Sequence, residues 1–253
     1  MRRSLRSSTD AGAARLKTRE RSGPVNGSSS RRALVVGASR GLGLGLVQEL
    51  LARQWDVTAT VRRPTPALTA GPALRIESGI DIDDDAAVAG LHATLADAPK
   101  FDLVFVVAGV ATEAGTPAGQ VPRQVVLDVY QTNAISPIRF AEAFHDRVAD
   151  GGLIALMTSK LGSVSLNRGG GWGSYRASKA GLNTLARSFY GQHGKAEWGL
   201  ILMHPGWVRT DMGGRRASLN IETSVRGMVD VIEGRLGERG CVFLDHAGET
   251  VPW

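Results

Sequence analysis

Ala33-Leu-Val-Val-Gly-Ala-Ser-Arg-Gly-Leu-Gly43 is the stretch that decides how this 253-residue chain folds. Its first four residues are apolar and predict a short strand, and apolar residues at 46, 47, 50 and 51 predict a helix after it. Glycines in the connecting turn let the backbone approach a pyrophosphate, which the N–H groups of a helix N-terminus can bind. Glycine-rich turns are common, but the place of this one between a strand and a helix favours a dinucleotide-binding site over a plain turn.

Strand and helix patterns alternate along the rest of the chain. Strands are predicted at residues 56–60, 73–76, 101–107, 152–158, 200–204 and 241–244. Helices are predicted at residues 83–96, 124–148, 175–190 and 221–236, and Pro137 interrupts the second of these. The alternation indicates an α/β fold, a single doubly wound Rossmann-type parallel sheet over residues 31–253 with helices on both faces.

Residues 1–30 have the composition of a disordered basic tail. They are rich in Arg, Ser, Gly and Ala and hold almost no large apolar side chains, so they cannot form a core. Residues 1–32 carry nine Arg or Lys against two acids, which leaves residues 33–253 with a net charge of −1 although the whole chain carries +6. The domain therefore has no basic face for nucleic acid. The tail is open to three interpretations: a transit peptide, a disordered extension, or a start codon assigned too early.

Other classes of protein are disfavoured by what the sequence lacks. No apolar run approaches the roughly 20 residues that span a bilayer, so no membrane partner is expected. Cys241 is the only cysteine, which fits a reducing compartment. We expect a cytoplasmic protein, or an organellar one if the tail is a transit peptide. The five histidines show neither metal-ligand spacing nor a carboxylate cluster, so no metal site is expected.

Tyr175 and Lys179 lie four residues apart in a predicted helix, one turn apart on the same face. A free tyrosine titrates near pH 10, and a neighbouring Lys⁺ favours the phenolate and lowers that pKa. The pair is therefore expected to give and take a proton at physiological pH. Taken alone, Tyr-x-x-x-Lys also occurs by chance, as a solvated surface pair.

The glycine motif at 37–43 and the Tyr-x-x-x-Lys motif together resemble the short-chain dehydrogenase/reductase family, from about residue 33 to the end. The resemblance implies hydride transfer between a nicotinamide and a small-molecule carbonyl or alcohol substrate. Tyr175 is then the proton donor and Ser159 hydrogen-bonds the carbonyl oxygen. Lys179 lowers the pKa of the tyrosine and binds the nicotinamide ribose, and Asn133 holds a water behind the lysine.

The family resemblance also implies a set of cofactor contacts. Asp81 is expected to hydrogen-bond the adenine, and Thr210 to contact the nicotinamide amide. Arg62 follows the second strand where an acid would select NAD(H), so NADP(H) is expected as cofactor rather than NAD(H), although a solvated arginine is the alternative. The complete expected set is Gly37, Ser39, Arg40, Gly41, Leu42, Gly43, Arg62, Asp81, Ala108, Gly109, Tyr175, Lys179, Pro205, Gly206, Val208 and Thr210.

Residues 167–179, residues 204–214 and the terminal Val251-Pro-Trp253 are similar to the C-factor and sniffer-type carbonyl reductase branch of the family. We expect a homodimer or homotetramer. An NADP(H)-binding sensor or signalling protein of the C-factor type, with little turnover, is the alternative function. Substrate choice is expected to depend on the loops at 160–172 and 206–220.

Several residues depart from the family pattern or stay ambiguous. Val106-Val-Ala-Gly109 stands where the family commonly has Asn-Asn-Ala-Gly, which loses side chains that brace the sheet. Lys160 follows Ser159 directly and is expected to point to solvent, with an effect on the substrate as the alternative. Trp172 and Trp207 are equally compatible with a substrate pocket and with the core.

Pro137 bears on Asn133 as well as on the helix. A proline has no N–H, so the carbonyl of Asn133 lacks the partner that a continuous helix would give it. We expect an ordered water at that carbonyl, within reach of Lys179, that completes a proton relay from Tyr175. A simple kink without catalytic meaning is the alternative.

Overall fold

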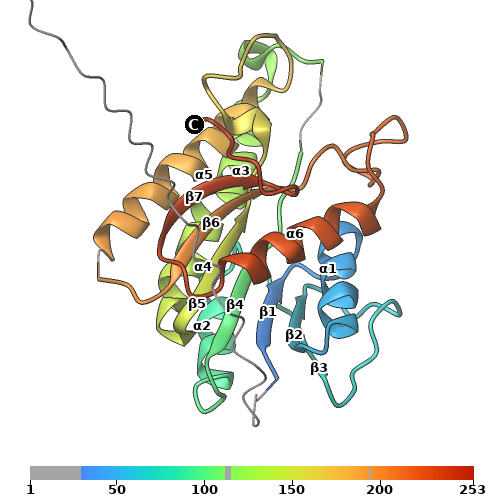
Figure 1. Cartoon of the computed structure of the whole chain (residues 1–253). Helices are drawn as coiled ribbons and strands as arrows, with labels where there is room; N and C mark the ends of the chain where they lie inside the picture. Colours follow the sequence, from blue (N-terminus) through green and yellow to red (C-terminus); the bar gives the residue numbers. More distant parts are fainter. Residues whose placement is uncertain (1–29, 112–114, 194) are drawn as a thin grey trace, which may run out of the picture.

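Seven parallel strands form one sheet in the computed structural model, in the order β3-β2-β1-β4-β5-β6-β7 (Figure 1). The structure describes residues 30–111, 115–193 and 195–253, so the predicted tail lies outside the described residues except for Ser30. The strands are β1 (Arg32–Val36), β2 (Asp56–Val61), β3 (Leu74–Ser78), β4 (Phe101–Val106), β5 (Val148–Met157), β6 (Gly199–His204) and β7 (Gly240–Asp245). Each pairs in parallel with its neighbours, which confirms the predicted fold class.

Helices cover both faces of the sheet because strand residues alternate between the two faces. Ala33 and Val35 pack with α1 (Gly41–Ala52) and α6 (Ile221–Arg235), which lie side by side in Figure 1. Leu34 and Val36 belong to the opposite core. That core also takes side chains from α2 (Asp85–Thr94), α4 (Ser136–Phe144) and α5 (Gly173–Gln192). Each core is formed by apolar residues that the alternating pattern predicts.

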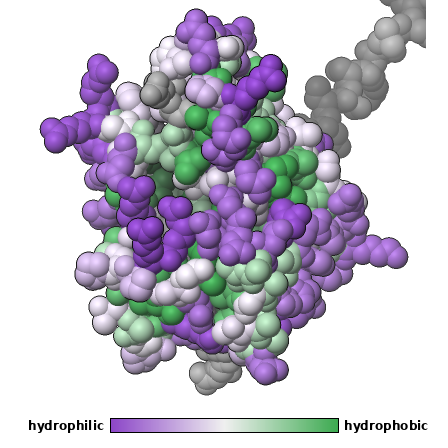
Figure 2. All heavy atoms as spheres, turned by 180° about the vertical axis from the view of Figure 1, so that it is seen from behind, coloured by the Kyte–Doolittle hydropathy of each residue, from purple (hydrophilic) through white to green (hydrophobic). Residues whose placement is uncertain are grey.

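The surface is mixed in polarity. Figure 2, seen from behind, shows hydrophilic residues spread over this face with smaller hydrophobic areas between them. Within the part of the chain that the structure describes, no helix has the length and hydrophobicity needed to cross a bilayer.

The structure corrects the predicted helix at 124–148. It is divided into α3 (Arg123–Tyr130), a π-helical turn η2 (Gln131–Ile135), α4 and a short 3₁₀ turn η3 (His145–Arg147). Pro137 sits at the second position of α4, where its missing N–H is tolerated. Val148 already belongs to β5, because it pairs with Phe101 before the strand register shifts.

The aspartates before α2 hold the π-helical turn in place. Asp84 caps α2, since its side chain accepts hydrogen bonds from two N–H groups of the first turn. Asp83 accepts from the hydroxyls of Thr132 and Ser136, each at 2.6 Å. Asp83 thereby anchors the segment that carries Asn133.

Candidate active site

A cavity of about 740 Å³ opens at the carboxyl ends of the strands. It lies where β1 and β4 are neighbours and the chain crosses to opposite sides of the sheet, which is where open α/β sheets bind ligands. Most predicted site residues line it: Gly37, Ser39, Arg40, Gly41, Leu42, Gly43, Arg62, Asp81, Ala108, Gly109, Tyr175, Lys179, Pro205 and Thr210. The cavity lining does not include Asn133, Ser159, Gly206 or Val208.

The glycine turn needs its glycines for steric reasons. Gly37 has a φ of +93°, which L side chains rarely adopt. A Cβ on Gly43 would lie 2.1 Å from the carbonyl oxygen of Gly37, so any side chain there would push the turn apart. Helix α1 begins at Gly41, and no side chain caps its first N–H groups. Those donors face the end of the cavity where a phosphate would complement them.

Arginines gather at the rim of this cavity. Nη1 of Arg62 lies 3.7 Å from Oδ2 of Asp81, so the structure brings together two residues that the sequence assigned separately. Nη1 of Arg40 pairs with Asp211 across the cavity at 2.7 Å. Arg215, which sequence reasoning missed, lines the same cavity. Arg215 lies in the 206–220 loop, which was expected from the sequence to determine substrate choice. That expectation was the one indication in the sequence that this residue belongs to the site.

Tyr175 and Ser159 meet at one side of the cavity. Tyr175 is on the first turn of α5, Ser159 follows β5, and their side chains are hydrogen-bonded. Ser159 also accepts from the N–H of Leu161 at 3.1 Å, which fixes its hydroxyl. Trp172 packs edge-on against the tyrosine ring with a centroid separation of 5.8 Å. The serine and tyrosine are therefore brought together as predicted.

The pKa of Tyr175 does not follow the expectation from the sequence. Burial raises it to about 12, and the hydrogen bond with Ser159 offsets only part of that rise. The predicted lowering by Lys179 is wrong for this arrangement, because the ammonium lies 6.0 Å from the ring centroid and is itself buried. The phenol keeps its proton at neutral pH.

Lys179 is an ionisable side chain that is almost completely buried in the site. Its side chain is on the same face of α5 as Tyr175, as predicted, and is only 3% exposed. Nζ donates to the carbonyl oxygen of Met157, at the end of β5, at 2.9 Å. Burial lowers the pKa of this lysine to about 7, since a charged ammonium is costly away from water.

Asn133 lies behind the lysine and braces the loop that follows β4. Its Oδ1 accepts from the N–H of Val110 and its Nδ2 donates to the Val110 carbonyl, both at 2.8 Å. Nδ2 also donates to Ser178 Oγ at 3.1 Å. A Cβ on Gly109 would lie 3.1 Å from Asn133 and 3.5 Å from Lys179 Nζ, which shows how closely these groups converge. The water relay stays a prediction.

Other predicted residues support the loop after β6. Gly206 has a φ of +85°, and a Cβ there would lie 2.3 Å from Leu219. Val208 is buried and pairs with Leu219 in a parallel bridge, so both residues shape the loop without lining the cavity. Trp207 is 55% exposed, so the core interpretation of this residue is wrong.

Lys160 does not simply point to solvent, as the sequence led us to expect. Its Nζ pairs with Oδ2 of Asp245 at 2.8 Å, and the side chain of Asp245 is only 7% exposed. Burial would raise the pKa of Asp245, but hydrogen bonds from Lys160 and from the N–H groups of Ala247 and Glu249 lower it overall. The pair ties the turn beside Ser159 to the end of β7.

Comparison with known proteins finds close relatives. The sequence pattern that defines the short chain dehydrogenase family matches residues 31–219 of this chain. The chain is 41% identical to C-signal of Myxococcus xanthus over 126 residues, which cover 49% of this chain and 76% of that protein. A carbonyl reductase from Pseudomonas aeruginosa in complex with NADP is 36% identical, with a TM-score of 0.82 and coverage of 89% and 100% of the two chains. Carbonyl reductase Sniffer of D. melanogaster is 28% identical, with a TM-score of 0.78 and the same coverage.

The buried lysine predicts a specific pH dependence of stability. Unfolded lysine titrates near pH 10.4 and folded Lys179 near 7, so between these values only the unfolded chain holds the proton. The free energy of unfolding should therefore rise by about 1.4 kcal/mol per pH unit from this one group. Denaturant titrations from about pH 7.5 to about pH 9 should show that Lys179→Met lowers this slope by that amount.

The same substitution at the exposed Lys100 is the matched control and should leave the slope as in the wild type. Equal slopes for the wild type and Lys179→Met would show that the ammonium is solvated, contrary to the structure.

Proposed function

Because the chain belongs to the short chain dehydrogenase family, we propose that it is an NADPH-dependent oxidoreductase that interconverts a carbonyl compound and an alcohol. The observation that carries the proposal is that Tyr175, which is hydrogen-bonded to Ser159, lines the same cavity as the buried Lys179 and the glycine turn. This arrangement puts a proton donor and a phosphate-binding helix start in one cavity.

The residues that line the cavity fit the parts of NADP(H). Uncapped N–H groups at the start of α1 suit the pyrophosphate, and Gly37 and Gly43 leave room for it. Arg62 is exposed and stands where a 2′-phosphate would be read, with Asp81 beside it for the adenine. Thr210 and Lys179 line the cavity near Tyr175 and are assigned to the nicotinamide and its ribose by the family pattern.

The cofactor, when bound, supplies or accepts the hydride. Tyr175 then supplies the proton to the substrate oxygen, and its raised pKa keeps that proton on the phenol until charge develops on the acceptor. Ser159, held by the N–H of Leu161, donates a hydrogen bond to the same oxygen. Lys179, whose pKa is lowered to about 7 by burial, can exchange a proton near neutral pH and is assigned to restoring the proton of the tyrosine after turnover.

Substrate selection falls to the surface beyond Tyr175. Trp172 lies against the tyrosine ring and is partly exposed, which gives the substrate side of the site an aromatic wall. Trp207 is exposed on the other loop, and its Nε1 donates to the Gly213 carbonyl at 2.9 Å. We assign substrate recognition to the loops 160–172 and 206–220, and the substrate class to small carbonyl compounds or alcohols.

A sensor that binds NADP(H) with little turnover is the second candidate, and the similarity to C-signal is the observation that favours it. The complete Ser159, Tyr175 and Lys179 set supports the enzyme instead, because a cofactor sensor has no use for a proton donor. The two functions differ in whether NADPH absorbance falls when ketones, aldehydes and quinones are added. Binding of NADPH without loss of absorbance across the panel would favour the sensor.

Removal of one hydroxyl tests the proton donor. Tyr175→Phe keeps the ring that packs on Trp172 and should keep NADPH affinity, while turnover falls by about 10²-fold or more because the general acid is lost. Initial rates of NADPH oxidation and a cofactor titration measure the two effects. Tyr130→Phe, at an exposed tyrosine on α3, is the control and should match the wild type. Turnover of Tyr175→Phe within a few-fold of the wild type would exclude the assignment.

The choice of cofactor is tested at Arg62. Arg62→Ala should weaken NADPH binding much more than NADH binding, because only NADPH carries the 2′-phosphate. A loss of about 1.5 to 3 kcal/mol for NADPH is expected from one charge-assisted hydrogen bond. The adjacent Arg63 is exposed and is not part of the cavity lining, so Arg63→Ala is the matched control. Equal losses for both cofactors in Arg62→Ala would show that Arg62 does not read the phosphate.

A further inference from the structure

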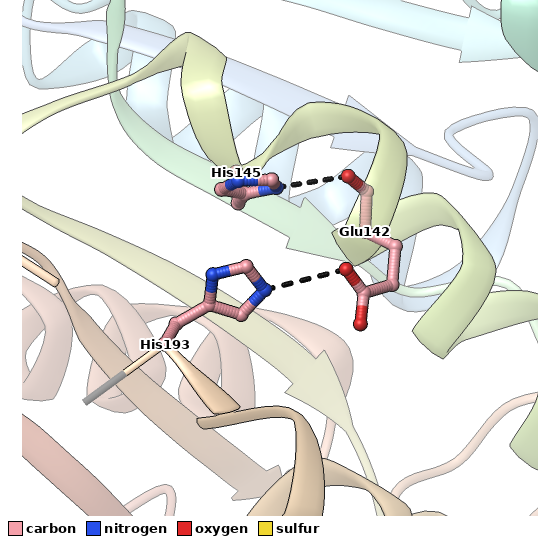
Figure 3. Close-up of side chains that lie close together, drawn as sticks. All are labelled: Glu142, His145 and His193. Atoms are coloured by element: carbon pink, nitrogen blue, oxygen red, sulfur yellow. Dashed lines mark hydrogen bonds and ion pairs between the residues drawn. The ribbon is translucent and has the colours of Figure 1, made fainter. Parts of the chain in front are cut away.

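A second group of chemically active side chains lies outside the cavity. Glu142 is near the end of α4, His145 opens η3, and His193 follows α5 (Figure 3). One ligand atom from each of the three lies within 4.8 Å of the other two. None of the three lines the cavity, so the group belongs to a different site.

His145 has its ring nitrogens already assigned by a hydrogen bond. Its Nδ1 lies 2.8 Å from the main-chain carbonyl oxygen of Glu142, an acceptor, so Nδ1 carries the proton (Figure 3). The neutral ring then has its lone pair on Nε2. Metal-binding histidines usually have this arrangement, with one nitrogen donating to a carbonyl and the other free for the ion.

Glu142 and His193 are already spaced as two ligands of one ion. Glu142 Oε2 and His193 Nε2 are 3.3 Å apart. Tetrahedral zinc with bonds of about 2.1 Å separates its ligand atoms by about 3.4 Å. One ligand atom of each residue lies within 4.8 Å of the other two, so the widest separation must shorten by at most about 1.4 Å to reach that value. Glu142 is exposed and both histidines are partly exposed, so side-chain rotation can provide this.

The surroundings of the two rings favour a fixed geometry. The rings of His145 and His193 contact each other in a tilted arrangement, with centroids 4.3 Å apart and an angle of 44° between their planes. Phe189 packs edge-on against both of them, and Trp198 lies 6.0 Å from His193. An apolar wall on one side and solvent on the other restricts the imidazoles while leaving an ion a path of entry.

We propose that Glu142, His145 and His193 bind a zinc ion that links the ends of α4 and α5. Two imidazoles and one carboxylate are borderline donors that suit Zn²⁺ and are a poor match for Mg²⁺ or Ca²⁺, which prefer oxygen ligands. After rotation of the His145 ring, the ion takes Nε2 of this residue together with Nε2 of His193 and an oxygen of Glu142, and a water fills the fourth position. It replaces the contact between Glu142 and His193 with two stronger bonds.

The three residues of this group are not recognisable as neighbours from the sequence alone. Glu142 and His145 are three residues apart, but His193 follows a different helix, far along the chain. In the folded chain the three residues lie close together, although their spacing in the sequence is not that of typical metal ligands.

The test uses the full chain without a histidine tag. Isothermal titration with ZnCl₂ should show one site per chain, and zinc should raise the melting temperature, because the ion binds the folded chain. Addition of Co²⁺ as a spectroscopic probe should give the visible bands of a tetrahedral complex. Glu142→Gln and His193→Asn should each weaken zinc affinity by at least about tenfold, since loss of an outer partner alone costs that much.

Two control variants separate this site from other histidines. His92→Asn removes a histidine that contacts a single carboxylate, Asp146, and should bind zinc as the wild type does. His246→Asn removes a histidine of the β7 turn and should also leave affinity unchanged. Unchanged NADPH affinity in Glu142→Gln and His193→Asn shows that these variants are folded. No zinc binding by the wild type, or equal binding by Glu142→Gln and His193→Asn, would overturn the proposal.

Discussion

The hydrogen bond from the Lys179 ammonium to the Met157 carbonyl is the interaction on which the site depends. It holds a lysine in the interior at the end of β5, and the described residues show no ion pair that compensates its charge. Helix α5 lies close enough for this because Gly162 packs on the Lys179 backbone, where a Cβ would come within 2.8 Å. The position of the lysine in turn sets the position of Tyr175, one turn earlier on the same helix.

Burial acts on the two titrating groups in opposite directions. It raises the pKa of the tyrosine to about 12 and lowers that of the lysine to about 7. A neutral phenol beside a lysine that changes protonation near neutral pH is a suitable pair for donating a proton and then recovering it. The effect comes from the low polarity of the surroundings rather than from direct attraction between the two side chains, which the Tyr-Lys spacing had suggested.

Much of the fold could be predicted from local patterns. Strand and helix periods, the glycine turn and the order of the motifs are properties of neighbouring residues, so six of the seven strands are close to their predicted positions. The break at Gln131–Ile135 escaped prediction because it is a single π-helical turn, which is too short for the apolar spacing of the flanking helices to reveal it. The contacts of Asn133 with Val110, and of Lys160 with Asp245, also escaped, because each joins residues far apart in the sequence.

A titration of the lysine itself measures whether burial shifts its pKa. In protein labelled with ¹³C at the lysine ε carbons, the five lysines give a small set of resonances, and Lys179→Met identifies one of them. This resonance should titrate near pH 7 and shift when NADPH is added. Titration of Lys179 near pH 10.4, as for a solvated lysine, or no response to NADPH, would contradict this expectation.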